Sequence, residues 1–149
     1  MKFLVEDSLT KLAKKLRFLG FDTEICSRNE IEGAVSNRDV FLTKSRKALE
    51  IAMRFRIRCY LIKSENWKSQ LKSVVHRFRI NYKDIDFLSR CSKCNGELEI
   101  ASLEDLCGVP DYILLTKESF SKCKKCGHIY WEGSHVEHMR LIIEIVEKW

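Results

Sequence analysis

The chain has little proline and no long hydrophobic run. It contains one proline and six glycines among 149 residues, and its hydrophobic content of 45% is too high for a disordered chain. No apolar run approaches the roughly 18 residues that a membrane-spanning helix needs. The first residues, MKFLVEDSLT, place acids directly after a short apolar stretch and show no small-residue cleavage site. These absences predict a folded, soluble protein in the cytoplasm.

Cysteine is abundant, but its number is odd. Of the seven cysteines in the chain, Cys91 and Cys94 form one C-x-x-C pair, and Cys123 and Cys126 form a second. Metal thiolates use this spacing in reducing compartments, where disulfide frameworks are rare. Turn-forming residues follow each pair and let the backbone curl around an ion. The pattern predicts zinc, with redox chemistry or an iron–sulfur cluster as the alternatives.

Such a site would be closed, because thiolates from Cys91, Cys94, Cys123 and Cys126 fill all the positions of a tetrahedral zinc ion. We therefore expect the zinc to be structural, so any hydrolytic chemistry must lie elsewhere.

Charge is distributed unevenly. Residues 1–90 carry 20 Lys and Arg against 11 Asp and Glu, whereas residues 91–149 carry 7 against 10. A basic surface attracts polyanions, so RNA or DNA is the expected partner of the N-terminal part. The alternative is a solvated coat of basic side chains that has no ligand.

Short apolar stretches alternate with amphipathic segments over the first 78 residues. This alternation predicts a parallel sheet flanked by helices on both faces, with function at the carboxyl ends of the strands. The expected strands are residues 2–5, 21–25, 40–43 and 59–62, and the expected helices are residues 9–19, 29–36, 45–55 and 66–78.

The C-terminal part has a different pattern. The cysteine pairs bracket residues 95–122, where turn residues separate short apolar pieces. A terminal helix is expected after Trp131. We therefore predict an α/β domain over residues 1–88 and a zinc ribbon with a C-terminal helix over residues 89–149.

Several stretches together resemble one known family. In chain order they are FLVEDSLTKLAKKLRFLGFDT, VFLTKSR, FLSRCSKCNGEL, GVP and CKKCGHIYWEGSHVEHM. They are similar to the PIN-like ribonuclease domain with a fused zinc ribbon, named after the C-terminal part of the mutator-seven exonuclease. The resemblance covers nearly the entire chain. It implies a PIN-like α/β fold and a metal-dependent ribonuclease.

In that family, carboxylates at the carboxyl edge of the sheet hold Mg²⁺ or Mn²⁺ for attack on a phosphodiester. The resemblance implies Glu6 and Asp7 as ligands here, with Asp22 or Glu30 helping. The chain departs from the family pattern after the third strand, where Ser45 stands in place of an expected Asp. The acidic centre is therefore incomplete.

Two functions follow from these features. The first is an endoribonuclease in which basic side chains position the RNA backbone; the expected RNA-binding residues are Lys11, Lys14, Lys44, Arg46 and Lys47. The second is a catalytically degenerate relative that binds RNA, the ribosome or another ribonucleoprotein through the same basic face. In a third interpretation the acidic ribbon docks a protein and the basic face serves solubility alone.

Overall fold

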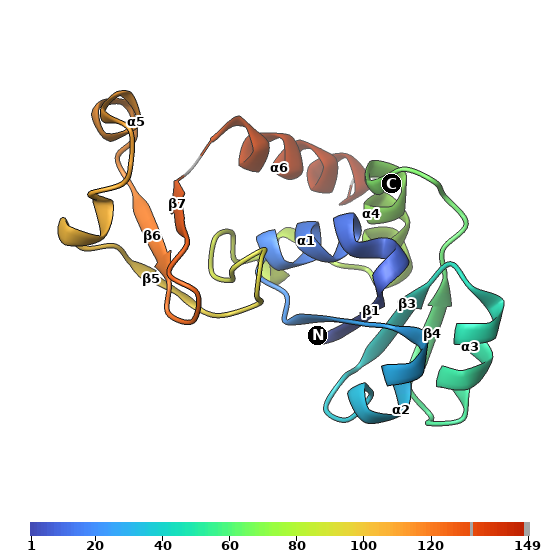
Figure 1. Ribbon diagram of the computed structural model, residues 1–149. Helices are drawn as coiled ribbons and strands as arrows, with labels where there is room; N and C mark the ends of the chain where they lie inside the picture. The colour runs from blue at the N-terminus through green and yellow to red at the C-terminus, as the bar shows by residue number, and fades with distance from the viewer. Residues whose placement is uncertain (132, 148–149) are drawn as a thin grey trace.

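The computed structural model describes residues 1–131 and 133–147 and shows a parallel sheet covered by helices (Figure 1). The strand order is β2-β1-β3-β4, and every neighbouring pair is parallel. The strands are β1 (Phe3–Glu6), β2 (Thr23–Cys26), β3 (Val40–Thr43) and β4 (Arg58–Leu61). The predicted sheet is confirmed, with β4 as an outer strand.

The helices lie on both faces of the sheet. Side chains on successive residues of a strand point to opposite faces, so Phe3 and Val5 share one core and Leu4 belongs to the other. The first core is completed by α1 (Thr10–Phe18), α4 (Trp67–Arg77) and α6 (Ser134–Glu147), and the second by α2 (Ile31–Ala34) and α3 (Arg46–Met53). Short 3₁₀ turns complete this part: η1 (Asp7–Leu9), η2 (Arg28–Glu30) and η3 (Tyr82–Asp84).

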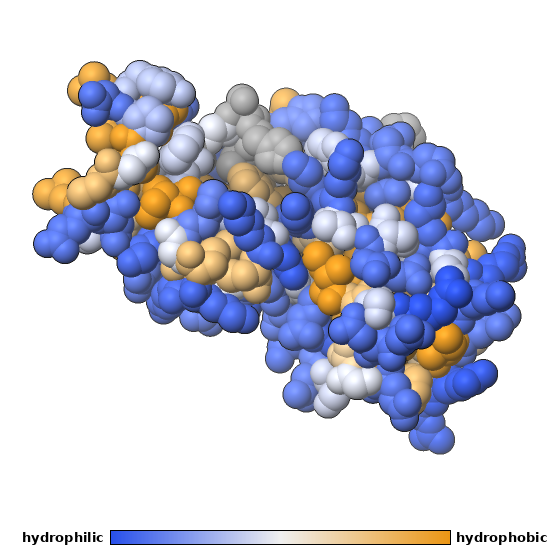
Figure 2. Space-filling view, viewed as in Figure 1, coloured by the Kyte–Doolittle hydropathy of each residue, from blue (hydrophilic) through white to orange (hydrophobic). Residues whose placement is uncertain are grey.

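The C-terminal part begins with a small antiparallel sheet in the order β5-β6-β7. Its strands are β5 (Leu98–Ile100), β6 (Phe120–Cys123) and β7 (Ile129–Trp131). Between β5 and β6 lie η4 (Glu104–Leu106) and α5 (Asp111–Thr116). Large side chains are exposed at the end of β5 and on this insert, and Figure 2 shows orange surface at that end of the molecule. They include Ile100 of β5 and Leu103, Tyr112 and Leu115 of the insert.

Helix α6 returns from the ribbon to the α/β part. It packs against α4, and Met139, Ile142 and Ile143 are buried in the same core as α1 (Figure 1). The first and last helices of the chain therefore share one apolar core. The predicted boundary at residue 88 stays a prediction.

The predicted fold class is confirmed: a parallel α/β sheet flanked by helices, a cluster of cysteines and a terminal helix. Among the described residues, none of the helices combines the length and apolarity that crossing a membrane requires.

Candidate active edge and metal centre

A buried glutamate lies at the carboxyl edge of the parallel sheet. Glu6 ends β1 and is 5% exposed. Its Oε1 accepts a hydrogen bond of 2.8 Å from the hydroxyl of Thr43, and one of 3.1 Å from the hydroxyl of Ser8. Thr43 Oγ1 in turn accepts a hydrogen bond of 3.0 Å from the backbone N–H of Ser45. Because Thr43 ends the neighbouring strand β3, these bonds fix the Glu6 carboxylate at the sheet edge.

Two further acids lie at the same edge. Asp7 is exposed directly after Glu6, and Glu30 is exposed at the end of η2, which follows β2. Cys26 ends β2 and is paired in register with Glu6, so its thiol lies at the same edge. Burial, followed by the negative charges of these three acids and Glu24, raises the pKa of Cys26 to about 12. The fold thus brings Glu6, Asp7 and Glu30 together, and it keeps the Cys26 thiol protonated at neutral pH.

Glu30 is also engaged with its own backbone. Its Oε1 accepts a hydrogen bond of 2.9 Å from the N–H of Ser27, as part of a capping box. Hydrogen bonds with Ser27 hold the pKa of Glu30 below its ordinary value. Glu30 is therefore ionised at neutral pH, but the cap already uses one of its oxygens.

Ser45, where the family resemblance implied an Asp, pairs with an arginine. Arg28 Nη2 donates a hydrogen bond of 2.9 Å to Ser45 Oγ. The same oxygen caps α3 by accepting from the backbone N–H of Ala48 at 3.3 Å. Within residues 1–131 and 133–147, the only group of three or more His, Cys, Asp or Glu ligand atoms close enough to share an ion is the cysteine cluster. The edge acids are neighbours without forming such a group.

The expected RNA-binding residues divide between this edge and helix α1. Lys44, Arg46 and Lys47 follow β3 and therefore lie at the edge beside Glu6. Lys44 Nζ makes an ion pair of 2.6 Å with Glu65, while the other two are exposed. On α1 the residues are Lys11 and Lys14, also exposed.

Asp22 lies at the opposite edge of the sheet, so the structure corrects its expected place as a helper of Glu6. It precedes β2, and a residue before a strand and a residue after it are separated by the whole strand. Asp22 Oδ1 receives hydrogen bonds of 2.7 Å from Arg38 Nη1 and from Asn95 Nδ2. Burial raises the pKa of Asp22, but these bonds outweigh burial and hold that pKa below its ordinary value.

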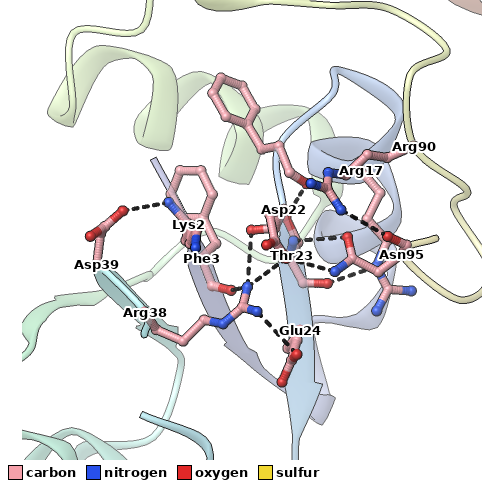
Figure 3. Close-up of polar contacts among 11 residues, drawn as sticks. Lys2, Phe3, Arg17, Asp22, Thr23, Glu24, Arg38, Asp39, Arg90 and Asn95 are labelled. Atoms are coloured by element: carbon pink, nitrogen blue, oxygen red, sulfur yellow. Dashed lines mark hydrogen bonds and ion pairs between the residues drawn. The ribbon is translucent and has the colours of Figure 1, made fainter. Parts of the chain in front are cut away.

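The contacts of Asp22 belong to a polar joint between the ribbon and the α/β part (Figure 3). The backbone N–H of Thr23 donates to Asn95 Oδ1 at 3.0 Å. Arg17 is buried; it donates to the Thr23 carbonyl at 2.8 Å and to the Ser92 carbonyl at 3.0 Å. Ser92 lies between the first two metal-ligand cysteines, so the joint grips the cysteine turn itself.

The four predicted cysteine ligands converge as expected. Their sulfur atoms all lie within 4.8 Å of one another; they are Cys91, Cys94, Cys123 and Cys126. Such an all-thiolate group could hold a metal ion such as zinc. Cys107, between the two pairs in sequence, is exposed and lies outside this group.

Neighbouring groups shape the cysteine cluster. The Tyr130 hydroxyl lies 3.0 Å from Cys91 Sγ and accepts from the backbone N–H of Ser92 at 3.1 Å. A Cβ at Gly96 would come within 2.9 Å of Cys123 Sγ, so a larger residue would displace that sulfur. Tyr130 is therefore half-buried against the cysteine cluster, where its hydroxyl contacts the first cysteine turn.

Some residues of these sites were missed at the sequence level. Thr43 is the buried partner of Glu6, and its signal in the sequence was a hydroxyl residue at the end of a predicted strand. Arg28 and Asn95 stand in turns, where polar residues are ordinary. The pairing order of the strands and the docking of the ribbon are needed before any of the three gains a role.

The fold and these sites define an α/β protein with acids at the carboxyl edge of its sheet and an appended cluster of four cysteines that could hold a metal ion. A family model described as the Mut7-C RNAse domain matches residues 1–143. The chain belongs to this family, which confirms the resemblance and indicates RNA as a substrate or partner. No curated protein and no solved structure matches the chain.

Proposed function

We propose that this protein is a divalent-metal-dependent endoribonuclease that acts on RNA at the carboxyl edge of its sheet. The observation that carries the proposal is the placement of Glu6, Asp7 and Glu30 after β1 and β2 at one edge of the sheet, in a chain that belongs to a ribonuclease family. Mg²⁺ is commonly held by one or two carboxylates together with substrate phosphates and waters, so an incomplete protein cage is sufficient.

Glu6 and Asp7 have different parts in this proposal. Glu6 is held in place by Thr43 and Ser8 and offers its second oxygen to an ion. Asp7 is exposed and reaches the solvent side of the same edge. A bound Mg²⁺ or Mn²⁺ would supply an activated water and stabilise the leaving oxygen. Arg46 and Lys47 neutralise the RNA backbone beside the acids, and the cysteine cluster holds a structural zinc ion.

The test is cleavage of a set of labelled RNAs by purified protein over a range of Mn²⁺ concentrations. Glu6→Gln and Asp7→Asn preserve side-chain shape and remove the charge. Residues that only support a metal ligand typically change activity by about 10–100-fold when they are replaced. We expect each of these two substitutions to reduce the cleavage rate by more than that. Glu50→Gln, an exposed change on α3, is the matched control and should leave the rate unchanged. A rate that survives Glu6→Gln contradicts the assignment.

Thr43 is proposed as a positioning residue. Thr43→Val removes the hydroxyl that holds Glu6 and should cost about 10–100-fold in rate, chiefly through a weaker response to Mn²⁺. Thr43→Ser keeps the hydroxyl and should restore the response. Equal rates for the two variants would show that the hydrogen bond has no functional part.

A second candidate function is RNA binding without cleavage, to free RNA or to a ribonucleoprotein such as the ribosome. It is favoured by the contact between Arg28 and Ser45, which places a cation where the family pattern has an acid. Ser45→Asp restores that acid and keeps the cap of α3, because Asp is a good N-cap residue. If wild type binds RNA without cutting it and Ser45→Asp cuts, the protein is a degenerate relative. Cleavage by wild type removes this candidate.

A further inference from the structure

Exposed arginines gather at the opposite edge of the sheet from Glu6, around the start of the outer strand β4. They come from two short stretches, RFRIR at the end of α3 and HRFR at the end of α4. We call them the arginine surface: Arg54, Arg56, Arg58, Arg77 and Arg79, all exposed. None of them is among the RNA-binding residues expected from the sequence.

One aromatic ring brings the two stretches together. The guanidinium carbon of Arg58 lies 5.4 Å from the centroid of the Phe78 ring, and that of Arg77 lies 5.6 Å from it. Beneath these cations, Phe78 packs edge-on against Tyr60 and Phe3 at ring distances of 5.9 and 6.3 Å. The ring is thereby anchored in the sheet, and it holds two like charges on a rigid platform.

The backbone at this surface is also unusual. Arg56 follows the end of α3 with φ 59°, and Arg79 follows the end of α4 with φ 51°. Gly or Asn ordinarily occupies this left-handed position after a helix. The helix dipole favours a cation near each helix end. It does not explain why two consecutive helices are both followed by an Arg in the left-handed conformation.

The arginine surface lacks counter-charges of its own. Within the described residues, no ion pair involves any of its arginines. Two acids of this region accept hydrogen bonds from other groups. Asp39 accepts one from the backbone N–H of Lys2, and Glu147 accepts one from the backbone N–H of Tyr82. Glu147 lines a shallow hollow with Arg77 and Arg79, so it offsets part of the charge there. The rest of the charge is available to an external anion.

We infer that the arginine surface is a second RNA contact, which binds the phosphate backbone away from the acidic edge. Arg suits this role because its planar guanidinium can bind phosphate through two parallel hydrogen bonds. Only β4 separates the surface from the carboxyl edge, a span of about 13 Å at ~3.3 Å per strand residue. An RNA of a few nucleotides beyond the reacting bond therefore reaches both. The choice of RNA as the polyanion rests on the proposed function.

A simpler account is that charges on the outer strand prevent edge-to-edge pairing of sheets. It predicts no effect of these arginines on RNA affinity. The two accounts are separated by measuring RNA binding in EDTA, where no divalent ion is present and cleavage cannot contribute.

The experiment compares wild type with Arg58→Gln/Arg77→Gln by fluorescence anisotropy of a labelled single-stranded RNA at several salt concentrations. We expect at least tenfold weaker binding, and a slope of log affinity against log salt that is smaller by about 1.4, at about 0.7 per lost phosphate contact. Lys124→Gln/Lys125→Gln removes the same charge from the ribbon and should leave affinity and slope unchanged. Equal binding by wild type and the arginine variant overturns the inference.

A second measurement does not depend on the stability of the variant. Hydrogen exchange of the wild-type protein should slow in residues 54–61 and 76–81 when RNA is added. No slowing there overturns the inference as well. Neither result touches the endoribonuclease proposal, which is tested by the Mn²⁺-dependent rate and its loss in Glu6→Gln.

Discussion

The α/β part and the ribbon hold their shapes by different means. The α/β part buries apolar side chains on both faces of its sheet, among them Leu4 and Leu16. In the described stretch 89–131, the buried apolar side chains are those of Cys91, Val109 and Cys123. Burial of apolar surface is the main favourable term in folding. The ribbon has little of this term, so we expect it to depend on a metal ion held by its cysteine cluster, while the sheet that carries the acids is stabilised by its own core.

This difference predicts which substitutions destabilise each part. Damage to the cysteine cluster should open the ribbon and spare the sheet, whereas damage to the core should reduce the stability of the sheet directly. The joint around Arg17 and Asp22 connects the two parts through hydrogen bonds, so the effect of breaking one of them should be smaller than either.

Loss of the metal should have the largest effect. Structural zinc ions contribute about 10–16 kcal/mol in isolated zinc-finger peptides, far more than the few buried side chains of this ribbon can replace. In Cys91→Ser, or after chelation, we expect amide protection to be lost across β5, β6 and β7 and retained in β1 and β3. Hydrogen-exchange mass spectrometry and zinc content measure both.

The matched control for this prediction is Cys107→Ser, because Cys107 is exposed and outside the cluster. It should change neither zinc content nor protection. Full protection of the ribbon in Cys91→Ser would mean that the ribbon is stable without its metal, and the contrast between the two parts would disappear.

The same truncation, Leu to Ala, compares the core of the sheet with the surface of the ribbon. Leu4→Ala creates a cavity in a fully buried site and should lower the free energy of unfolding by about 2–5 kcal/mol. Leu115→Ala, on the exposed insert of the ribbon, should change it by no more than about 0.5 kcal/mol. Urea titration of the zinc-loaded protein at pH 7 gives both values. A large loss in Leu115→Ala would show that the exposed apolar insert packs against something in solution.

The strands of the sheet and the cysteine cluster could both be predicted from the sequence. The strands are short apolar runs whose order in the chain sets a parallel sheet, and all of them lie within two residues of their predicted positions. The cysteine cluster follows from its spacing, because two C-x-x-C turns have few other uses. These are local patterns.

Long-range placement was harder to foretell. The apolar face of α6 is evident in the sequence, but nothing in it says that the helix leaves the ribbon and packs on α4. The family resemblance implied Asp22 or Glu30 as a helper of Glu6. Asp22 precedes β2, however, and only residues after a strand reach the carboxyl edge. The bond from Thr43 to Glu6 depends on the pairing of β1 with β3, which sequence order does not give.

The smallest expected effect is at the joint. Asp22 and Glu24 both pair with Arg38, but Asp22 is 19% exposed and also holds Asn95 of the ribbon, whereas Glu24 is 53% exposed. Asp22→Asn should lower the free energy of unfolding by about 1 kcal/mol, and Glu24→Gln by less.

The pH dependence follows from the direction of the Asp22 pKa, which is lower in the folded protein than its ordinary value of 3.8. A lowered folded-state pKa gives stability that is fully present above the ordinary value and is lost as pH falls through the lowered one. The difference between wild type and Asp22→Asn should therefore stay constant from pH 7 to pH 5. Urea titrations at both pH values measure it. A difference that shrinks within this range would show that another group, and not Asp22, controls the joint.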